Sequence, residues 1–198
     1  MTSQAQVVLV HGYTGSGPEH WQTWLADELA REGSPALFPR LPDDHDPALI
    51  DWADTLRSAL ESAAPSESWV VLAHSLGCWL WVHLQRKHDL PRPDRTLLVA
   101  PPSPAWVAAH LSRFPAPRWA DLTEVVSQTG AEVVIGSGDE FLPEVDRAAL
   151  LEAAPGTREV PGGGHLHTAA GYGPWPAVRA WVEGDLSPLH AQSHPVVR

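Results

Sequence analysis

The chain has 198 residues, a length that suits one domain with a single sizeable hydrophobic core. Hydrophobic residues make up 43% of it and charged residues 19%, as is typical of a soluble globular protein. The formal net charge of -11 argues against nucleic acid and anionic membrane surfaces as partners, because both repel an acidic protein.

The N-terminal segment MTSQAQVVLVHG carries no recognisable targeting signal, because it lacks a basic stretch and its apolar run, Val7–Val10, is short. No stretch of the sequence approaches the roughly 18 apolar residues of a membrane-spanning helix. The single cysteine, Cys78, excludes a disulfide within the chain. We therefore expect a cytoplasmic protein without a membrane partner.

Short apolar runs and helix-like spacing alternate along the chain. In order, they predict a strand over Val7–Val10, a helix over Pro18–Arg31, a weak strand over Ala36–Phe38, a helix over Pro47–Ala63, a strand over Trp69–Ala73, a helix over Leu76–Lys87, a strand over Thr96–Ala100, a strand over Glu132–Ile135, a helix over Glu144–Ala153, a strand over Arg158–Val160 and a helix over Trp175–Glu183.

The predicted strands are uninterrupted apolar runs rather than alternating ones, so both of their faces are expected to be buried. This predicts a single-domain α/β fold over residues 1–184, with a mostly parallel central sheet and helices on both faces. Residues 185–198 lack periodicity and are expected to form a disordered tail. Because ligands of such sheets bind beyond the carboxyl ends of the strands, reactive residues that follow strands are the candidates for a site.

Ser75 follows the predicted strand Trp69–Ala73. The segment AHSLG around it matches the nucleophile elbow of hydrolases, with alanine in place of the first glycine. A sharp turn at the serine brings the strand end close to the helix start, so the residues two before and two after must be small, as Ala73 and Gly77 are. The alternative is a serine that only caps the following helix, which is a common use of this residue.

Asp139 follows the predicted strand Glu132–Ile135, at the right place for an acid that orients a catalytic base. By itself this signal is weak, because an aspartate after a glycine, here Gly138, is also a frequent turn pairing. The neighbouring Glu140 would point elsewhere, and Asp146 lies inside the next predicted helix.

His165 follows the predicted strand Arg158–Val160, after three consecutive glycines that allow the backbone to turn sharply inward. His167 is its rival, and a solvated histidine on a flexible loop is the alternative. The chain order Ser75, Asp139, His165 is the order of an α/β-hydrolase triad, and together the three residues are far more specific than any one of them.

The loop after the first strand, HGYTGSG, is placed to complete an oxyanion hole. The backbone N–H groups of Tyr13 and Leu76 are the predicted donors, because a helix N-terminus and a nearby loop can both point at the reacting centre. We expect His11 to hold this loop by hydrogen bonds rather than to react. His74 is expected either to support the elbow or to have no role, since adjacent side chains diverge and it cannot easily serve Ser75.

The segment from Pro101 to Trp119 must pass near the site, and its prolines stiffen it. Trp106, Phe114 and Trp119 offer apolar walls and predict a small, partly aromatic acyl pocket. The alternative is that these rings simply pack on the core.

The segments VHGYTGSGPEHWQTWL, LAHSLGC, GSGDEFLP and GGGHLHTAAGYGPWP together resemble the small serine hydrolases of the retinoblastoma-binding-protein-9 (YdeN-like) family, from roughly Val7 to Val182. The resemblance implies an α/β-hydrolase fold without a large lid domain and a triad carried by Ser75, Asp139 and His165. It also implies esterase-like activity on small ester substrates, and it favours His165 over His167.

Two other functions compete with an esterase. The chain could be a protein-binding module with weak or idle catalysis, which exposed tryptophans would support. Eleven histidines and the segment HLH raise the idea of a metal site, but His165 and His167 lack a third ligand at a usual spacing. We therefore expect no metal and no cofactor.

Overall fold

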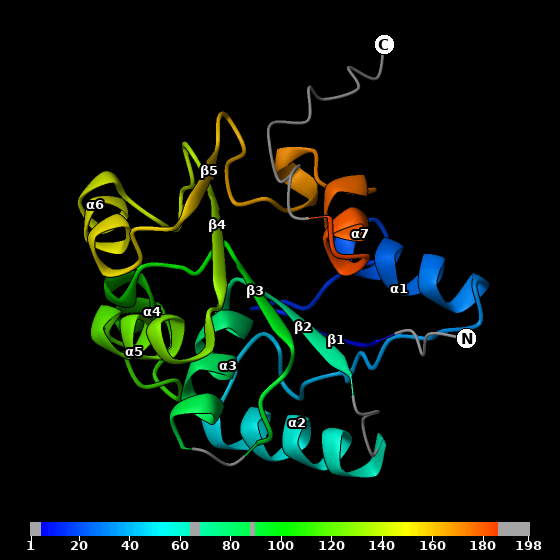
Figure 1. Ribbon diagram of the computed structural model, residues 1–198. Coiled ribbons are helices and arrows are strands. Elements are labelled where there is room, and N and C mark those ends of the chain that lie inside the picture. Colours follow the sequence, from blue (N-terminus) through cyan, green and yellow to red (C-terminus); the bar gives the residue numbers. More distant parts are fainter. Residues whose placement is uncertain (1–4, 64–67, 88–89, 186–198) are drawn as a thin grey trace.

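The computed structural model describes residues 5–63, 68–87 and 90–185. Within them, five parallel strands form one sheet whose order follows the chain (Figure 1). The strands are β1 (Gln6–Val10), β2 (Trp69–His74), β3 (Arg95–Val99), β4 (Glu132–Gly136) and β5 (Arg158–Val160). Because all of them run the same way, the residues that follow their carboxyl ends meet at one edge of the sheet.

Helices cover both faces of the sheet, as predicted (Figure 1). One face carries α1 (Trp21–Arg31) and α7 (Pro176–Val182), and the other carries α2 (Leu49–Ala63), α3 (Leu76–Arg86), α4 (Pro104–His110), α5 (Trp119–Thr129) and α6 (Glu144–Ala153). Successive strand residues alternate between the two apolar layers: Val8 and Val10 pack toward α2 and α3, whereas Val7 and Leu9 pack toward α1. Burial of both strand faces explains why the strands read as unbroken apolar runs.

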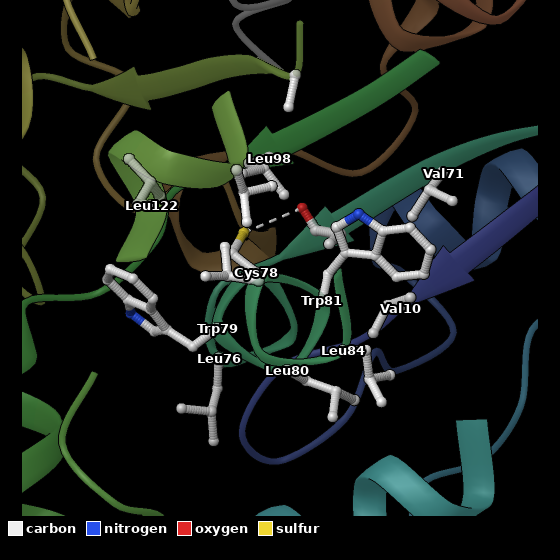
Figure 2. Packing of buried hydrophobic residues seen from close by; sticks show 14 of the residues in the cluster. Val10, Val71, Leu76, Cys78, Trp79, Leu80, Trp81, Leu84, Leu98 and Leu122 are labelled. Carbon is white, nitrogen blue, oxygen red and sulfur yellow. Dashed lines mark hydrogen bonds between the residues drawn. The ribbon is translucent and has the colours of Figure 1, made fainter. Parts of the chain in front are cut away.

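Helix α3 is buried on nearly every side, so it is a rigid base for the residue that precedes it. Figure 2 shows its side chains radiating around the helix axis, with Leu76, Cys78, Trp79, Leu80, Trp81 and Leu84 in contact with the core. Burial raises the pKa of the Cys78 thiol, and its Sγ lies 3.3 Å from the carbonyl oxygen of Ala73. This cysteine is therefore a small, unreactive core residue.

Two helices and one strand differ from the sequence-based expectation. The segment after β3, expected to be a proline-stiffened stretch, contains α4 and α5. Ser103 caps α4 by accepting hydrogen bonds from Ala105 N and Trp106 N, and Pro104 occupies the first turn, a position that suits proline. The predicted strand Ala36–Phe38 is reduced to one parallel bridge between Leu37 and Val8.

The helix predicted over Pro18–Arg31 begins only at Trp21, because the imidazole of His20 caps it by accepting a hydrogen bond from Gln22 N at 3.2 Å. A short 3₁₀ turn, η1 (Thr168–Ala170), was not predicted. Of the predicted tail, residues 185–198, all but Asp185 lies outside the described residues. None of the described helices is long and apolar enough to cross a membrane.

Candidate active site

Ser75 sits at the tight turn between β2 and α3. Its backbone has φ 54° and ψ -127°, a left-handed conformation that is strained for any residue except glycine. Its side chain makes no capping hydrogen bond to α3. The serine is therefore held on an elbow and is not an ordinary helix cap.

The elbow fits because two glycines let the backbone segments approach closely. A Cβ atom on Gly77 would lie 2.5 Å from the carbonyl oxygen of His11. A Cβ atom on Gly12 would lie 2.6 Å from the Cβ of Ser75. Gly77 thus meets the predicted need for a small residue two positions after the serine, and the fully buried Ala73 meets it two positions before.

Three side chains that follow β2, β4 and β5 form one hydrogen-bonded chain. His165 Nε2 lies 2.8 Å from Ser75 Oγ, and His165 Nδ1 lies 2.8 Å from Asp139 Oδ2. Because a carboxylate only accepts hydrogen bonds, Nδ1 carries the proton and Nε2 is free to accept from the serine hydroxyl. All three side chains are buried. The structure therefore brings the three predicted residues together.

Asp139 and the two acidic residues near it, Glu140 and Asp146, differ in their surroundings. The second oxygen of Asp139, Oδ1, accepts a hydrogen bond from Phe141 N at 2.8 Å, which fixes the carboxylate. Glu140 is exposed. Asp146 accepts a hydrogen bond from Ser103 Oγ at 2.6 Å and so anchors the start of α4.

The glycine-rich loop before His165 turns inward, as expected. Gly162 and Gly164 have φ values of 67° and 52°, in the left-handed region that glycine tolerates. Gly164 N donates to the carbonyl oxygen of Ser137 at 3.1 Å, which ties the loop to the end of β4. The loop is therefore compact and fixed against the strand that precedes Asp139.

The two predicted oxyanion donors come from the elbow, for Leu76, and from the loop after β1, for Tyr13. Leu76 is the first residue of α3, so its N–H has no acceptor within the helix. Tyr13 lines the same pocket as Ser75 and follows Gly12, whose added Cβ would lie 3.1 Å from Leu76 N. The tight loop is closed by a hydrogen bond from Gly15 N to the carbonyl oxygen of Gly12 at 3.1 Å.

His11 holds the loop after β1 by hydrogen bonds, as expected. Its Nε2 accepts from Leu41 N at 3.0 Å, so its Nδ1 carries the proton and donates to the carbonyl oxygen of Gly12 at 2.9 Å. Burial lowers the pKa of His11, which keeps the ring neutral and both hydrogen bonds in place.

A pocket of about 360 Å³ opens at Ser75. Its aromatic walls are Tyr13, Trp106 and Phe141, and the ring of Phe141 lies 4.4 Å from that of His165. Its other lining residues are Thr14, Gly15, Gly17, His20, His74, His165, His167 and Thr168. No lysine, arginine, aspartate or glutamate lines this pocket among the described residues, so its wall carries no fixed charge.

Of the three rings predicted to line a pocket, Trp106 lines the pocket that contains Ser75, whereas Phe114 and Trp119 do not. Phe114 is buried in the core, 6.0 Å from the ring of Trp52, and Trp119 packs on Trp79 at 5.3 Å. Phe114 and Trp119 lie away from the site. The segment after β3 turns away from the site beyond Trp106, as it passes from α4 to α5.

Phe141 and His20 are pocket residues that sequence reasoning did not single out. Phe141 lies two residues after Asp139, on the same turn, so its proximity to that acid was a usable signal. His20 precedes α1, and burial lowers its pKa to about 3, so it is neutral. Since its Nδ1 accepts from Gln22 N, its Nε2 carries the proton, and this N–H is buried without a partner in the described structure.

No group of three or more histidine, cysteine, aspartate or glutamate side chains is arranged to hold a metal ion in the described part of the chain. His167, the rival of His165, lies beside it with ring centroids 5.3 Å apart, and burial lowers its pKa. It has no contact with Asp139 like that of His165, so the geometry selects His165.

Comparison with known proteins shows which family the chain belongs to. The model of the family described as serine hydrolase matches residues 7–183. Over 73 residues the chain is 40% identical to YdeN of Bacillus subtilis (strain 168), which is described as a hydrolase, and this match spans 37% of each protein.

Solved structures share the fold at low sequence identity. The crystal structure of the Bacillus subtilis ydeN product superposes with a TM-score of 0.70 at 24% identity, over 91% of this chain and 97% of that one. A YdeN-like hydrolase from Pectobacterium atrosepticum gives 0.68 at 20% identity, over 92% and 91%. A thermophilic esterase from Thermogutta terrifontis gives 0.56 at 17% identity, over 91% and 90%. The family match covers most of the chain, and the protein therefore belongs to the serine hydrolase family.

Proposed function

We propose that the protein hydrolyses small carboxylic esters through an acyl-enzyme formed on Ser75. The observation that carries this proposal is the continuous hydrogen-bonded chain from Ser75 Oγ through His165 to Asp139, with both links at 2.8 Å. Nothing about a purely structural role requires a strained serine, an imidazole and a buried carboxylate in this geometry.

In the proposed mechanism, Ser75 Oγ attacks the ester carbonyl while His165 Nε2 takes its proton. Asp139 holds the imidazole in the tautomer that can accept this proton, and it stabilises the imidazolium that forms. The protonated His165 then donates to the departing alkoxide. Water attacks the acyl-enzyme in the second half, with His165 acting as base again.

The backbone N–H groups of Leu76 and Tyr13 would bind the oxyanion of the tetrahedral intermediate. Loss of one such donor typically lowers kcat by about 10²–10³-fold. Because both donors belong to the main chain, the close approach of Gly12 to the Ser75–Leu76 peptide supports this assignment.

The pocket wall favours a small, uncharged and partly aromatic ester. Three aromatic rings line it, and the Tyr13 and Trp106 rings meet edge to face at 6.0 Å. The buried Nε2–H of His20 is available to an oxygen of the substrate, since a buried donor without a partner is costly. The net charge of -11 disfavours anionic substrates.

Labelling with a fluorophosphonate tests the mechanism. The wild type should be labelled on Ser75, and Ser75→Ala should abolish labelling. Absence of labelling on the folded wild type would contradict the proposal. A series of p-nitrophenyl esters of rising acyl length tests the pocket, and a preference for long chains would contradict a small site.

The alternative of a protein-binding module finds less support. It would be favoured by exposed tryptophans, but seven of the ten are buried and Trp24, Trp106 and Trp119 are half-buried. The large hydrophobic residues that are exposed in the described structure are Ile50 and Val145, which lie on different helices. The two residues therefore do not form an exposed apolar patch of the kind that suggests a protein partner.

A further inference from the structure

Two buried ring N–H groups, from His74 and Trp21, form hydrogen bonds with the main chain of the loop that carries His165. His74 Nε2 lies 3.1 Å from the carbonyl oxygen of His165. Trp21 Nε1 donates to the carbonyl oxygen of Leu166, also at 3.1 Å. Consecutive main-chain carbonyls are thus bound by side chains from the end of β2 and the start of α1.

The direction of the His74 hydrogen bond follows from chemistry. A carbonyl oxygen only accepts, so His74 Nε2 must carry the proton. Burial and the neighbouring His20 lower the pKa of His74 well below its ordinary value, so the ring is neutral and has one N–H. That single N–H is committed to the main chain of His165.

Both donor rings are themselves immobilised. The His74 ring lies 4.8 Å from that of His20, and it meets the edge of the Trp21 ring at 5.9 Å. Trp21 is fully buried and packs at 5.7 Å against Trp175 of the segment that leads into α7. The two donors therefore act as fixed points of the core and not as mobile side chains.

The loop needs such fixed points because its own backbone is strained. Leu166 has φ 49°, which is unfavourable for a side chain with a Cβ atom. Asp139 contacts His165 at the far end of the side chain, through Nδ1 of the ring. The position of the whole ring relative to Ser75 Oγ depends on where the main chain of residues 165 and 166 is held.

We propose that Trp21 and His74 are positioning residues, which fix the main chain of His165 and Leu166 so that the imidazole lies within reach of Ser75. This inference rests on the proposed serine hydrolase function. It gives a role to the tryptophan of the His20-Trp21 pair and to the histidine before the nucleophile, neither of which touches the reacting atoms in the mechanism above. A misplacement of about 1 Å in such a geometry can lower the rate by about 10²-fold.

The test measures both the rate and the final extent of fluorophosphonate labelling, together with unfolding by urea. His74→Leu and Trp21→Phe each remove a donor but keep most of the apolar volume. We expect both variants to label to completion but at least about tenfold more slowly than the wild type, with KM for a p-nitrophenyl ester little changed for Trp21→Phe. His74→Gln should recover much of the rate, because the glutamine amide can place an N–H near the position of Nε2.

Trp81→Phe is the matched control. Trp81 is also fully buried, but its Nε1 has no hydrogen-bond partner in the described structure. It should lose stability as Trp21→Phe does while labelling at close to the wild-type rate. A labelling rate for Trp81→Phe as slow as that of Trp21→Phe would show that general loosening of the core is the cause.

The outcomes separate the two proposals. A wild type that does not label overturns the proposed function itself. Folded His74→Leu and Trp21→Phe that label at the wild-type rate overturn only the positioning role. Should these two fail to fold, His74→Gln and His74→Asn decide the matter, because the shorter asparagine amide cannot reach the same carbonyl. Equal labelling rates for that pair would overturn the inference.

Discussion

Gly136, the last residue of β4, lies directly against Gly164 in the loop that carries His165. A Cβ atom on Gly136 would come 2.3 Å from the carbonyl oxygen of Gly164 and 2.6 Å from the carbonyl carbon of Gly163. These are main-chain atoms, which cannot rotate away as a flexible side chain can. The close contact of the two segments brings the acid after β4 and the histidine after β5 to the same place.

Gly136→Ala should therefore lower activity more than a surface mutation would. We expect the loop to be displaced from Ser75, with kcat for a small ester lowered by about 10²-fold and stability lowered by roughly 1–3 kcal/mol. Kinetics and urea unfolding measure the two effects. Gly156→Ala is the matched control, because a Cβ atom there meets nothing within 4 Å. Wild-type kinetics in Gly136→Ala would show that the loop has room to move without cost.

The order of the elements and the three reactive residues could be predicted from the sequence, because both depend on local patterns. Unbroken apolar runs identified the buried parallel strands. The bounds of every predicted helix and strand that formed lie within two residues of those in the structure, apart from the start of α1. There, His20 caps the helix, and an imidazole is an unusual cap that spacing alone does not reveal.

The pocket was less predictable, because it depends on how the segment after β3 folds. Its many prolines suggested only a stiff segment, and Pro104 in fact begins α4. As a result only Trp106 of three predicted rings reaches the site. The contacts of His74 and Trp21 with the His165 loop join residues 91 and 145 positions apart, and no local pattern contains such information.

Asp139→Asn tests the role of the acid. An asparagine can keep the hydrogen bond from Phe141 N but would present its NH₂ group to His165 Nδ1, which favours the wrong tautomer. We expect kcat to fall by about 10⁴-fold, a loss typical of this change in a Ser–His–Asp triad. Glu140→Gln removes a neighbouring but exposed charge and should leave kcat close to that of the wild type. Equal effects of the two mutations would argue that only net charge matters.

Trp106→Ala tests the aromatic wall of the pocket. Trp106 meets Phe141 edge to face at 5.1 Å, so its removal opens the wall and loses a ring contact with the substrate. We expect selectivity for an aromatic over an acetyl ester, measured as a ratio of kcat/KM values, to fall by about tenfold, as loss of roughly one aromatic pair implies. Trp119→Ala should leave this ratio unchanged, because Trp119 packs on Trp79 away from the pocket. A change of selectivity in Trp119→Ala instead would place the acyl group on the other side of α4.

The buried neutral His20 should make stability depend on pH. Its pKa is lowered from 6.5 to about 3 by burial, so the unfolded chain binds a proton between these values that the folded protein excludes. The contribution of His20 to the free energy of unfolding is therefore fully present above about pH 6.5 and is lost progressively as the pH falls toward 3. Between pH 7.5 and pH 5 the loss from this one group is about 2 kcal/mol, because each pH unit below 6.5 is worth about 1.4 kcal/mol.

His20→Asn isolates this effect, since asparagine is a favoured helix cap and can replace the acceptor for Gln22 N without a titrating ring. Urea unfolding at the two pH values should show a smaller acid loss for the variant than for the wild type, by about that 2 kcal/mol. The other buried histidines, His11, His74 and His165, remain in both proteins. Because His20 also lowers the pKa of His74, the difference between the two pH dependences reports the loss of His20 together with its effect on His74. Identical pH dependences for the two proteins would mean that His20 binds a proton in the folded state as readily as in the unfolded chain.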